Sequence, residues 1–223
     1  MRKPAESKTS YFLSKKGKKV LKISLILSVV VLGAGFFLYA YLSYAGKLTY
    51  EKYLEGKDFY LKAQAEEDKQ QEKSDLKKAA ELFEEIISRR FFSGNKQEVF
   101  VYLADCFYRL GESDKSINLI KDFLKRYPKS YFSPWMRLKI ASICEEKGNY
   151  EEAIKYYQII RERYAQTSVA PEAVLGEARC CEALGRKEAA LKLYQNLISR
   201  YPLSSQAKIA EAKLQNFART NEG

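Results

Sequence analysis

The chain of 223 residues contains no histidine. This absence excludes Ser-His and Cys-His nucleophile pairs, histidine general bases and histidine-ligated metal sites. The chain also lacks a glycine-rich phosphate loop, a nucleophile elbow and a dinucleotide fingerprint. Acidic pairs such as Glu84-Glu85 and Glu151-Glu152 are neighbours on predicted helices, where adjacent side chains do not converge on one point. We therefore expect no enzyme, no cofactor and no metal site, and catalysis is the most remote of the functions considered.

Cysteine is scarce, with four residues in the chain. Cys180 and Cys181 are adjacent on a predicted helix and point in different directions. Cys144 and Cys181 occupy equivalent positions on helices whose axes would lie about 8–10 Å apart. A disulfide needs Cα atoms roughly 4.4–6.8 Å apart. We therefore expect the cysteines to be small buried apolar residues that form no disulfide.

The net charge of +11 comes mostly from the first 22 residues. Residues 1–22 hold eight lysine and arginine side chains and one glutamate, which leaves the other 201 residues with a net charge of only +4. The part of the chain expected to fold is nearly balanced, so we expect no nucleic-acid partner. The basic tail is interpreted as a cytoplasmic signal that orients a membrane protein.

One long uncharged run covers residues 23–45, with the sequence ISLILSVVVLGAGFFLYAYLSYA. As a helix this run extends over about 34 Å, which exceeds the ~30 Å thickness of a bilayer's hydrocarbon core. Tyr39, Tyr41 and Tyr44 cluster near its C-terminal end, where aromatic rings favour the membrane interface. Because lysines flank the N-terminal end, the positive-inside rule predicts a cytoplasmic N-terminus and a domain outside the cytoplasm.

A cleaved signal peptide is the alternative for this segment, since Ser43-Tyr44-Ala45 resembles a cleavage site. The apolar run is longer than the ~7–15 residues of a signal peptide's hydrophobic region, and the tail before it is also long. No cysteine follows the run at the position that a lipid anchor requires. The sequence favours an uncleaved single-pass anchor and leaves cleavage open.

Three glycines, Gly111, Gly148 and Gly185, lie 37 residues apart, and the same pattern surrounds each of them. Small residues lie seven positions before and five positions after each glycine, and large residues lie nine positions after it. A tyrosine follows sixteen positions after each glycine, and the next residue is Pro128 or Pro202 in two of the repeats. Such a period indicates stacked helical hairpins, in which glycine ends the first helix and proline ends the second. The sequence therefore predicts an all-α solenoid.

This pattern resembles the tetratricopeptide repeat, which has small residues where its helices cross, a large apolar residue between them and a glycine near the turn. The 37-residue period and endings such as RYPKS and RYPLSS are similar to the bacterial envelope branch of that family. Outer-membrane assembly lipoproteins and Tol-Pal-associated periplasmic proteins belong to that branch. The plan of tail, span and short array is similar to that of the single-span ancillary subunit of the Sec translocon. The resemblance covers roughly residues 47–223 and implies a solenoid that binds proteins.

The expected domain plan has a cytoplasmic tail at 1–22, a transmembrane helix at 23–45 and an extracytoplasmic repeat domain at 46–223. About four hairpins are expected, at 47–91, 96–129, 133–166 and 170–202, followed by a capping helix at 203–219. The first hairpin is placed by Ala79, Phe83 and Ile86, which lie 74 residues before their counterparts Ala153, Tyr157 and Ile160. Its first helix is expected within Leu48–Glu66. Residues 66–75 are expected to be too polar to pack, as a helix extension or a flexible insert.

In tetratricopeptide arrays the first helix of each hairpin lines a concave groove, and the resemblance implies groove positions in this chain. The candidates for partner binding are Val101, Asp105, Tyr108, Arg109, Trp135, Leu138, Ser142, Glu145, Glu172, Leu175, Arg179 and Glu182. Trp135, the only tryptophan, is interpreted either as an anchor packed between repeats or as a ligand contact. Apolar residues mixed with charges of both signs favour an extended peptide or a helix as the ligand. The set lacks the run of bases that clamps a peptide carboxylate in some arrays.

The favoured hypothesis is a membrane-anchored protein–protein interaction module in the bacterial inner membrane, with its repeats in the periplasm. It would hold exported chains or partner proteins in a chaperone-like or translocon-associated role, and the anchor would raise their local concentration. The alternative is a scaffold or adaptor of outer-membrane or cell-wall assembly machinery. The inner-membrane anchor and the missing lipid-attachment cysteine count against residence in the outer membrane.

Overall fold

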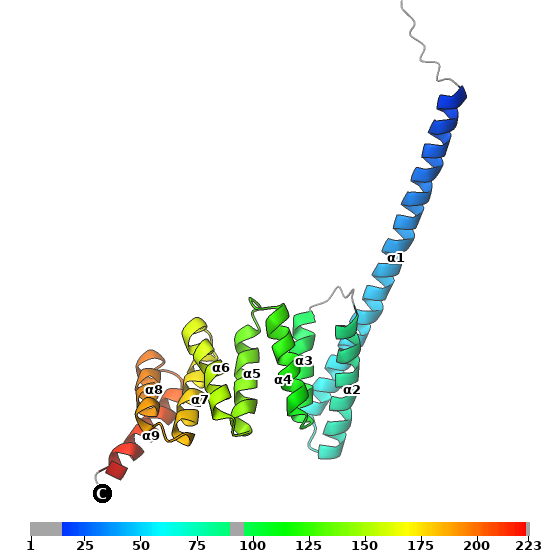
Figure 1. Ribbon diagram of the computed structural model, residues 1–223. Helices are drawn as coiled ribbons and strands as arrows, with labels where there is room; N and C mark the ends of the chain where they lie inside the picture. The colour runs from blue at the N-terminus through cyan, green and yellow to red at the C-terminus, as the bar shows by residue number, and fades with distance from the viewer. Residues whose placement is uncertain (1–14, 90–95, 222–223) are drawn as a thin grey trace, which may run out of the picture. The chain divides into compact units, whose positions relative to one another are not determined.

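The computed structural model describes residues 15–89 and 96–221, and every regular element in these ranges is an α-helix (Figure 1). The helices are α1 (Lys15–Ala65), α2 (Lys69–Ser88), α3 (Lys96–Arg109), α4 (Ser113–Arg126), α5 (Ser133–Glu146), α6 (Tyr150–Arg163), α7 (Ala170–Ala183), α8 (Lys187–Arg200) and α9 (Ser205–Asn221). The prediction of an all-α fold is confirmed. The chain divides into two compact units, Met1–Leu48 and Thr49–Gly223.

The first unit is described from Lys15 onward and consists of the N-terminal part of α1. Its apolar side chains are largely exposed along the whole stretch from Val20 to Tyr44. Among the described residues, α1 alone is long and apolar enough to cross a membrane, judged by length and composition. A helix whose apolar side chains are uncovered all round is suited to a lipid solvent. Residues 1–14 of the expected basic tail lie outside the described ranges, and residues 15–22, which hold five of its eight bases, belong to α1.

The second unit begins with the C-terminal part of α1, which packs on α2 as the first hairpin. The expected first helix of this hairpin is not a separate element, because α1 continues without a break to Ala65. The side chain of Asp68 begins α2 by accepting hydrogen bonds from the backbone N–H groups of Gln70 and Gln71. Residues 69–75 are therefore helical. The expectation that this segment is too polar to pack is wrong for Asp75, which is 5% exposed.

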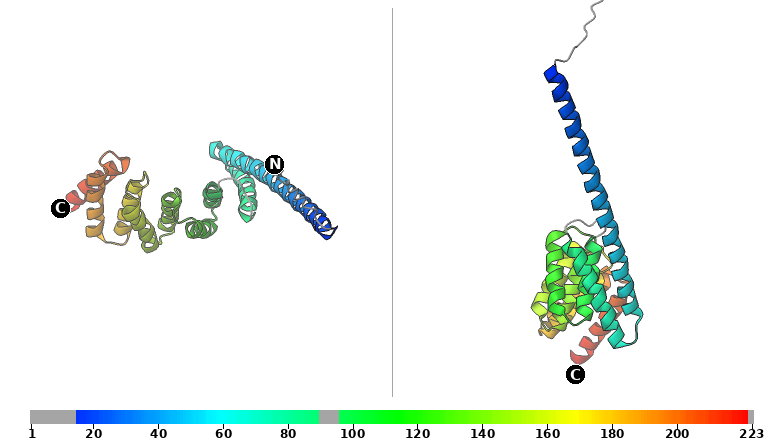
Figure 2. Two further views of the ribbon diagram at one scale, coloured as in Figure 1. Left: turned by 90° about the horizontal axis from the view of Figure 1, so that it is seen from above. Right: turned by 90° about the vertical axis from the view of Figure 1, so that its right-hand side faces the viewer.

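The remaining helices follow as the pairs α3/α4, α5/α6 and α7/α8, with α9 at the end (Figure 2). Each first helix ends at a glycine with a left-handed backbone, and φ is 82° at Gly111, 75° at Gly148 and 73° at Gly185. A residue with a side chain would be strained there. The N–H after each glycine donates to the carbonyl five residues earlier, in the pairs Glu112–Phe107, Asn149–Cys144 and Arg186–Cys181. This closure turns the chain into the second helix at the same point of every repeat.

The residues that recur around the glycines form the core. Those seven before, five after and nine after the glycines are all buried: Ala104, Ala141, Ala178, Ser116, Ala153, Ala190, Ile120, Tyr157 and Tyr194. One buried cluster joins α1, α2 and α3, and a second runs from α3 to α9. Because α3 contributes Leu103 to the first cluster and Phe100 to the second, the core passes through the stack without a break.

The four cysteines are free and buried, as the sequence predicted. Burial raises the pKa of Cys106 and of Cys180 to about 12. Since the thiolate is the reactive form, these thiols act as small apolar side chains.

Tyr157 of α6 and Gly176 of α7 form the tightest approach between hairpins that the glycines reveal. A Cβ atom added at Gly176 would lie 2.4 Å from Cζ of Tyr157. Real Cβ atoms do not approach so closely, and the ring cannot move aside because Tyr157 is fully buried. Glycine at position 176 therefore allows α7 to lie against the ring of the preceding hairpin.

We predict that Gly176→Ala lowers the free energy of unfolding by about 1–3 kcal/mol, since the extra methyl group overpacks a filled site. The measurement is denaturant unfolding of the full chain in mild detergent, followed by circular dichroism. A double-mutant cycle with Tyr157→Leu provides the control, because a smaller residue at 157 relieves the clash. Additive effects of the two substitutions would contradict this account.

Candidate functional site

The first helices of the hairpins lie along one side of the stack, and polar side chains connect each of them to the next. We call this surface the first-helix face; it comprises the twelve candidate positions and the partners named below on α1, α2, α5, α6 and α9. At its N-terminal end, Asp105 Oδ2 accepts a hydrogen bond from Tyr60 Oη of α1 at 2.8 Å. Asp105 Oδ1 lies 2.7 Å from Lys139 Nζ of α5. One carboxylate on α3 therefore connects three successive first helices.

Lys139 also lies 4.2 Å from the centroid of the Tyr108 ring, at cation–π distance. The Tyr108 hydroxyl donates to Glu146 Oε1 at 2.7 Å, which makes a second connection between α3 and α5. This hydrogen bond, followed by burial, raises the pKa of Tyr108 to about 12. The tyrosine is neutral at physiological pH and acts as a donor.

Arg109 connects the first two hairpins. Its Nη2 donates to the backbone carbonyl of Ala63 at 2.9 Å and to Glu72 Oε1 at 2.8 Å. Ala63 lies in the last turn of α1, where carbonyl groups have no partner within the helix. Arg109 therefore completes the C-terminus of α1 and also neutralises a carboxylate of α2.

Glu145 and Arg179 form the central pair of the face. Arg179 donates from Nε and Nη2 to the two carboxylate oxygens of Glu145, at 2.7 and 3.0 Å, and Tyr157 Oη donates to the same group at 2.7 Å. Burial opposes ionisation of Glu145, but the hydrogen bonds from Arg179 and Tyr157 outweigh it and lower the pKa of this carboxyl group. Arg179 also reaches Glu172 Oε1 at 3.2 Å, and Gln206 of α9 donates to Oε2 of Glu172 at 3.1 Å.

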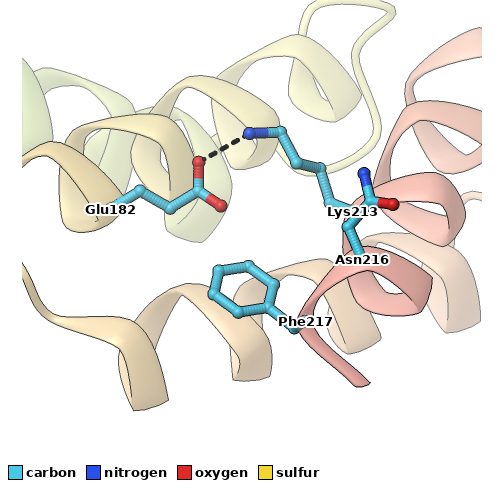
Figure 3. Close-up of a pocket in the computed structure, with 4 residues that line it drawn as sticks. All are labelled: Glu182, Lys213, Asn216 and Phe217. Atoms are coloured by element: carbon cyan, nitrogen blue, oxygen red, sulfur yellow. Dashed lines mark hydrogen bonds and ion pairs between the residues drawn. The ribbon is translucent and has the colours of Figure 1, made fainter. Parts of the chain in front are cut away.

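A small pocket lies at the C-terminal end of the face, between α7 and α9 (Figure 3). It has a volume of about 230 Å³ and is lined by Glu182, Lys213, Asn216 and Phe217. Lys213 Nζ donates to Glu182 Oε2 at 2.9 Å above the Phe217 ring (Figure 3). The volume is below the roughly 300–1,000 Å³ of small-molecule sites, so the pocket suits one side chain of a larger ligand.

The structure separates the sequence candidates into three groups. The charged candidates and Tyr108 have partners within the face, as described above. Leu175 is 2% exposed and lies in the core, so the expectation that it contacts a ligand is wrong: α9 packs on α7. Val101, Leu138 and Ser142 are half-buried, and Trp135 is 44% exposed. This exposure favours the interpretation of Trp135 as a ligand contact over that of an anchor packed between repeats.

The partners of the candidates were not predicted from the sequence, and Lys139, Lys213 and Asn216 are among them. Asn216 lies 37 residues after Arg179, and Lys213 lies 74 residues after Lys139, so the repeat frame contained a signal for them. That frame places α9 as the next first helix of the series, although the sequence analysis treated it only as a cap.

These features define a class of protein: a solenoid of helical hairpins whose first helices form a continuous, polar surface. Residues 98–130 and 138–205 match family models of the tetratricopeptide repeat. Arrays of this repeat are protein–protein interaction modules and are generally not catalytic. The comparison with curated proteins gives no match.

Solved structures show the same fold. A tetratricopeptide repeat protein from Parabacteroides merdae is 16% identical, with a TM-score of 0.59 over 77% of this chain and 62% of that one. The nearly identical TPR-like repeats of a putative kinesin light chain from Podosopora anserina are 14% identical, with a TM-score of 0.56 over 75% of this chain and 85% of that one. At such identities the likeness establishes a repeat solenoid and leaves the ligand undetermined.

We predict that Glu145→Gln destabilises the protein by about 1–2 kcal/mol at neutral pH, because it removes a charge from a bidentate pair that is partly exposed. A carboxyl group with a lowered folded-state pKa stabilises the fold above its unfolded pKa of about 4.3, and this contribution is lost as the pH falls through the folded pKa. The difference between wild type and variant should therefore be constant at neutral pH and shrink below pH ~4.3.

Denaturant unfolding between pH 3 and pH 7 measures this difference. Glu151→Gln is the matched control, because Glu151 forms a similar pair with Arg186 on the exposed surface. That variant should change stability little at any pH. A difference for Glu145→Gln that does not vary with pH would contradict the assigned role.

Proposed function

We propose that this protein is a membrane-anchored tetratricopeptide module that binds partner proteins or exported chains at the outer surface of a bacterial inner membrane. The partner occupies the first-helix face as an extended peptide or a helix. In this proposal the role is chaperone-like or translocon-associated. Residues 23–45 form the single-pass anchor, with the N-terminus in the cytoplasm and the repeats outside it.

The exposure of Trp135 is the observation that carries the binding proposal. The carboxylates and guanidinium groups of the face are committed to one another, so a ligand that recruited them would have to break existing pairs. The side chain of Trp135, by contrast, is 44% exposed and can be covered by a ligand without breaking an ion pair. Half-buried Leu138 lies one turn further along α5. Large aromatic side chains contribute strongly to binding when a partner covers them.

The charge pattern supports a ligand that is largely apolar. The pairs of the first-helix face leave little net charge to attract a strongly acidic or basic chain. Its polar groups can position a peptide backbone, while Trp135 and the small pocket beside Phe217 receive apolar side chains. Exported chains that have not yet folded expose such apolar side chains.

We predict that a photo-reactive amino acid at position 135 crosslinks to translocon subunits or newly exported chains in intact cells, identified by mass spectrometry. The control carries the same amino acid at Leu184, an exposed apolar residue in the turn after α7. Adducts with cell-wall or outer-membrane assembly proteins would favour the scaffold alternative. Adducts no stronger at 135 than at 184 would refute the binding site.

Once a partner is identified, Trp135→Ala should weaken its binding by about 30-fold, as truncation of an aromatic hot spot does. The measurement is titration of the partner onto the full chain in detergent. Leu184→Ala should leave the dissociation constant unchanged. Equal losses for the two variants would show that exposed apolar area in general, and not this site, carries the binding.

We also predict that a fragment lacking residues 1–45 is soluble, folds and still binds the partner. No described residue before Tyr53 contributes to either buried cluster of the second unit. Both clusters therefore remain complete in the fragment. Circular dichroism and gel filtration test the fold. A fragment that aggregates, or that folds but loses its partner, would show that residues 1–45 do more than tether.

A further inference from the structure

One edge of the hairpin stack is basic and carries exposed apolar side chains. We call it the loop edge and define it as residues 125–133, 161–169 and 199–205, each the end of a second helix with the connection to the next first helix. These segments contain six lysine or arginine residues and one glutamate. The connections at the other edge, residues 110–115, 147–152 and 184–188, contain four bases and five acids. The excess of positive charge is therefore confined to one edge.

Four of the six bases of the loop edge are available to a partner. Arg126 is paired with Asp122 and Arg161 with Glu177. The other four, Lys125, Lys129, Arg163 and Arg200, are exposed and form no ion pair with any described residue. At the opposite edge, by contrast, Lys115, Lys147 and Arg186 are each paired with a carboxylate.

Two apolar side chains project from the same edge. Tyr131 is 80% exposed in the connection between α4 and α5, and Leu203 is 98% exposed in the connection between α8 and α9. The favourable interaction of a base with a helix C-terminus accounts for bases in the last turns of α4, α6 and α8. It does not account for Lys129, which lies beyond α4, or for the two exposed apolar residues.

A series of contacts connects the loop edge to the point where the chain enters the second unit. Arg89 Nη1 donates to Thr49 Oγ1 at 3.1 Å, and Lys96 Nζ donates to the carbonyl of Arg89. Next along the edge, Ser130 Oγ donates to Gln97 Oε1. Further along, Arg137 lies over the Tyr164 ring at 5.4 Å.

At the C-terminal end of this series of contacts, Tyr201 Oη donates a hydrogen bond to the carbonyl of Ala165 at 2.9 Å. The contacts thus follow the connections from Thr49 to the end of the stack. Thr49 comes four residues after Ala45, where the uncharged run ends. Because α1 is continuous through these residues, about 6 Å of helix separates the end of the run from Thr49, and the start of the second unit lies near any bilayer that holds the run.

We propose that the loop edge docks on the anionic lipid headgroups of the membrane in which residues 23–45 are anchored. Lys125, Lys129, Arg163 and Arg200 neutralise the headgroup charge, while Tyr131 and Leu203 enter the interfacial layer. The inference rests on the proposed anchor. Docking would fix the first helices with their N-termini toward the bilayer and leave the first-helix face open from the side.

The single tryptophan reports on this contact without a label, because Trp135 follows Tyr131 by four residues in the first turn of α5. The full chain is reconstituted in vesicles of brominated phosphatidylcholine, with or without brominated phosphatidylglycerol, and quenching of tryptophan fluorescence is measured. We expect strong quenching only on the anionic vesicles, and its loss in 0.5 M salt, since screening removes the attraction. Equal quenching on both lipids, no quenching, or quenching that resists salt would overturn the inference.

Charge reversal locates the contact. The variant Lys129→Glu, Arg163→Glu, Arg200→Glu should reduce quenching on anionic vesicles to the level on phosphatidylcholine. The matched control, Lys155→Glu, Lys187→Glu, Lys192→Glu, reverses three exposed bases outside the loop edge and should be quenched like wild type. Equal behaviour of the two variants would overturn the inference. If the first variant fails to fold, the salt and lipid dependence of quenching in the wild type alone tests the loop-edge contact.

Flotation after extraction with alkaline carbonate separates this inference from the anchor on which it rests. Protein that is stripped from the vesicles contradicts the proposed anchor. Protein that floats after extraction, yet shows no lipid-dependent quenching, contradicts the loop-edge contact and leaves the anchor standing.

Discussion

Each hairpin of this chain has an apolar side that only a neighbouring hairpin can bury. Between α5/α6 and α7/α8, one large residue, Tyr157, provides this contact. Tyr157 fills the space between its own first helix and α7, and Gly176 is the residue that allows α7 to come so close. The same ring positions its hydroxyl on Glu145, which in turn holds Arg179 of α7. Between these two hairpins, hydrophobic contact and polar connection therefore depend on one side chain, and the spacing of α5 and α7 follows from it.

That spacing has a consequence for binding. Because neighbouring first helices are held at a fixed distance, carboxylates and bases on them reach one another directly, as Asp105 reaches Lys139 and Glu145 reaches Arg179. Such pairs contribute orientation more than affinity, since a ligand must offer at least as much as the partner it displaces. The surface that remains for recognition is apolar and small, around Trp135 and beside Phe217. A module of this kind gains selectivity from shape and from its location in the cell more than from charge.

The repeat frame predicted the backbone well because its determinants are local. A glycine that must adopt a left-handed conformation and small residues at helix crossings act within one hairpin, and Gly111, Ala104 and Ser116 have the predicted roles. The side-chain contacts between hairpins could not be predicted from the sequence, because they depend on the distances between hairpins. Leu175 follows the groove pattern of its repeat, yet it is buried in the core. The size and apolar surface of Trp135 are compatible with a buried anchor, yet 44% of it is exposed. The continuity of α1 also escaped sequence analysis, since no residue at positions 46–50 demands a break or forbids one.

The two edges of the stack differ in a way that the repeat alone does not require. Every hairpin needs a turn at each edge, and the turns at the glycines are neutralised by pairs such as Lys147–Asp114 and Arg186–Glu151. The connections at the other edge repeat a basic residue and a tyrosine at each second-helix end but provide no carboxylate for Lys129, Arg163 or Arg200. Unpaired charge of one sign repels itself and is not favoured by folding. In the proposed anchoring, the second unit begins four residues after the apolar run, and the anionic headgroups of that bilayer are the partner of opposite charge that would compensate these bases.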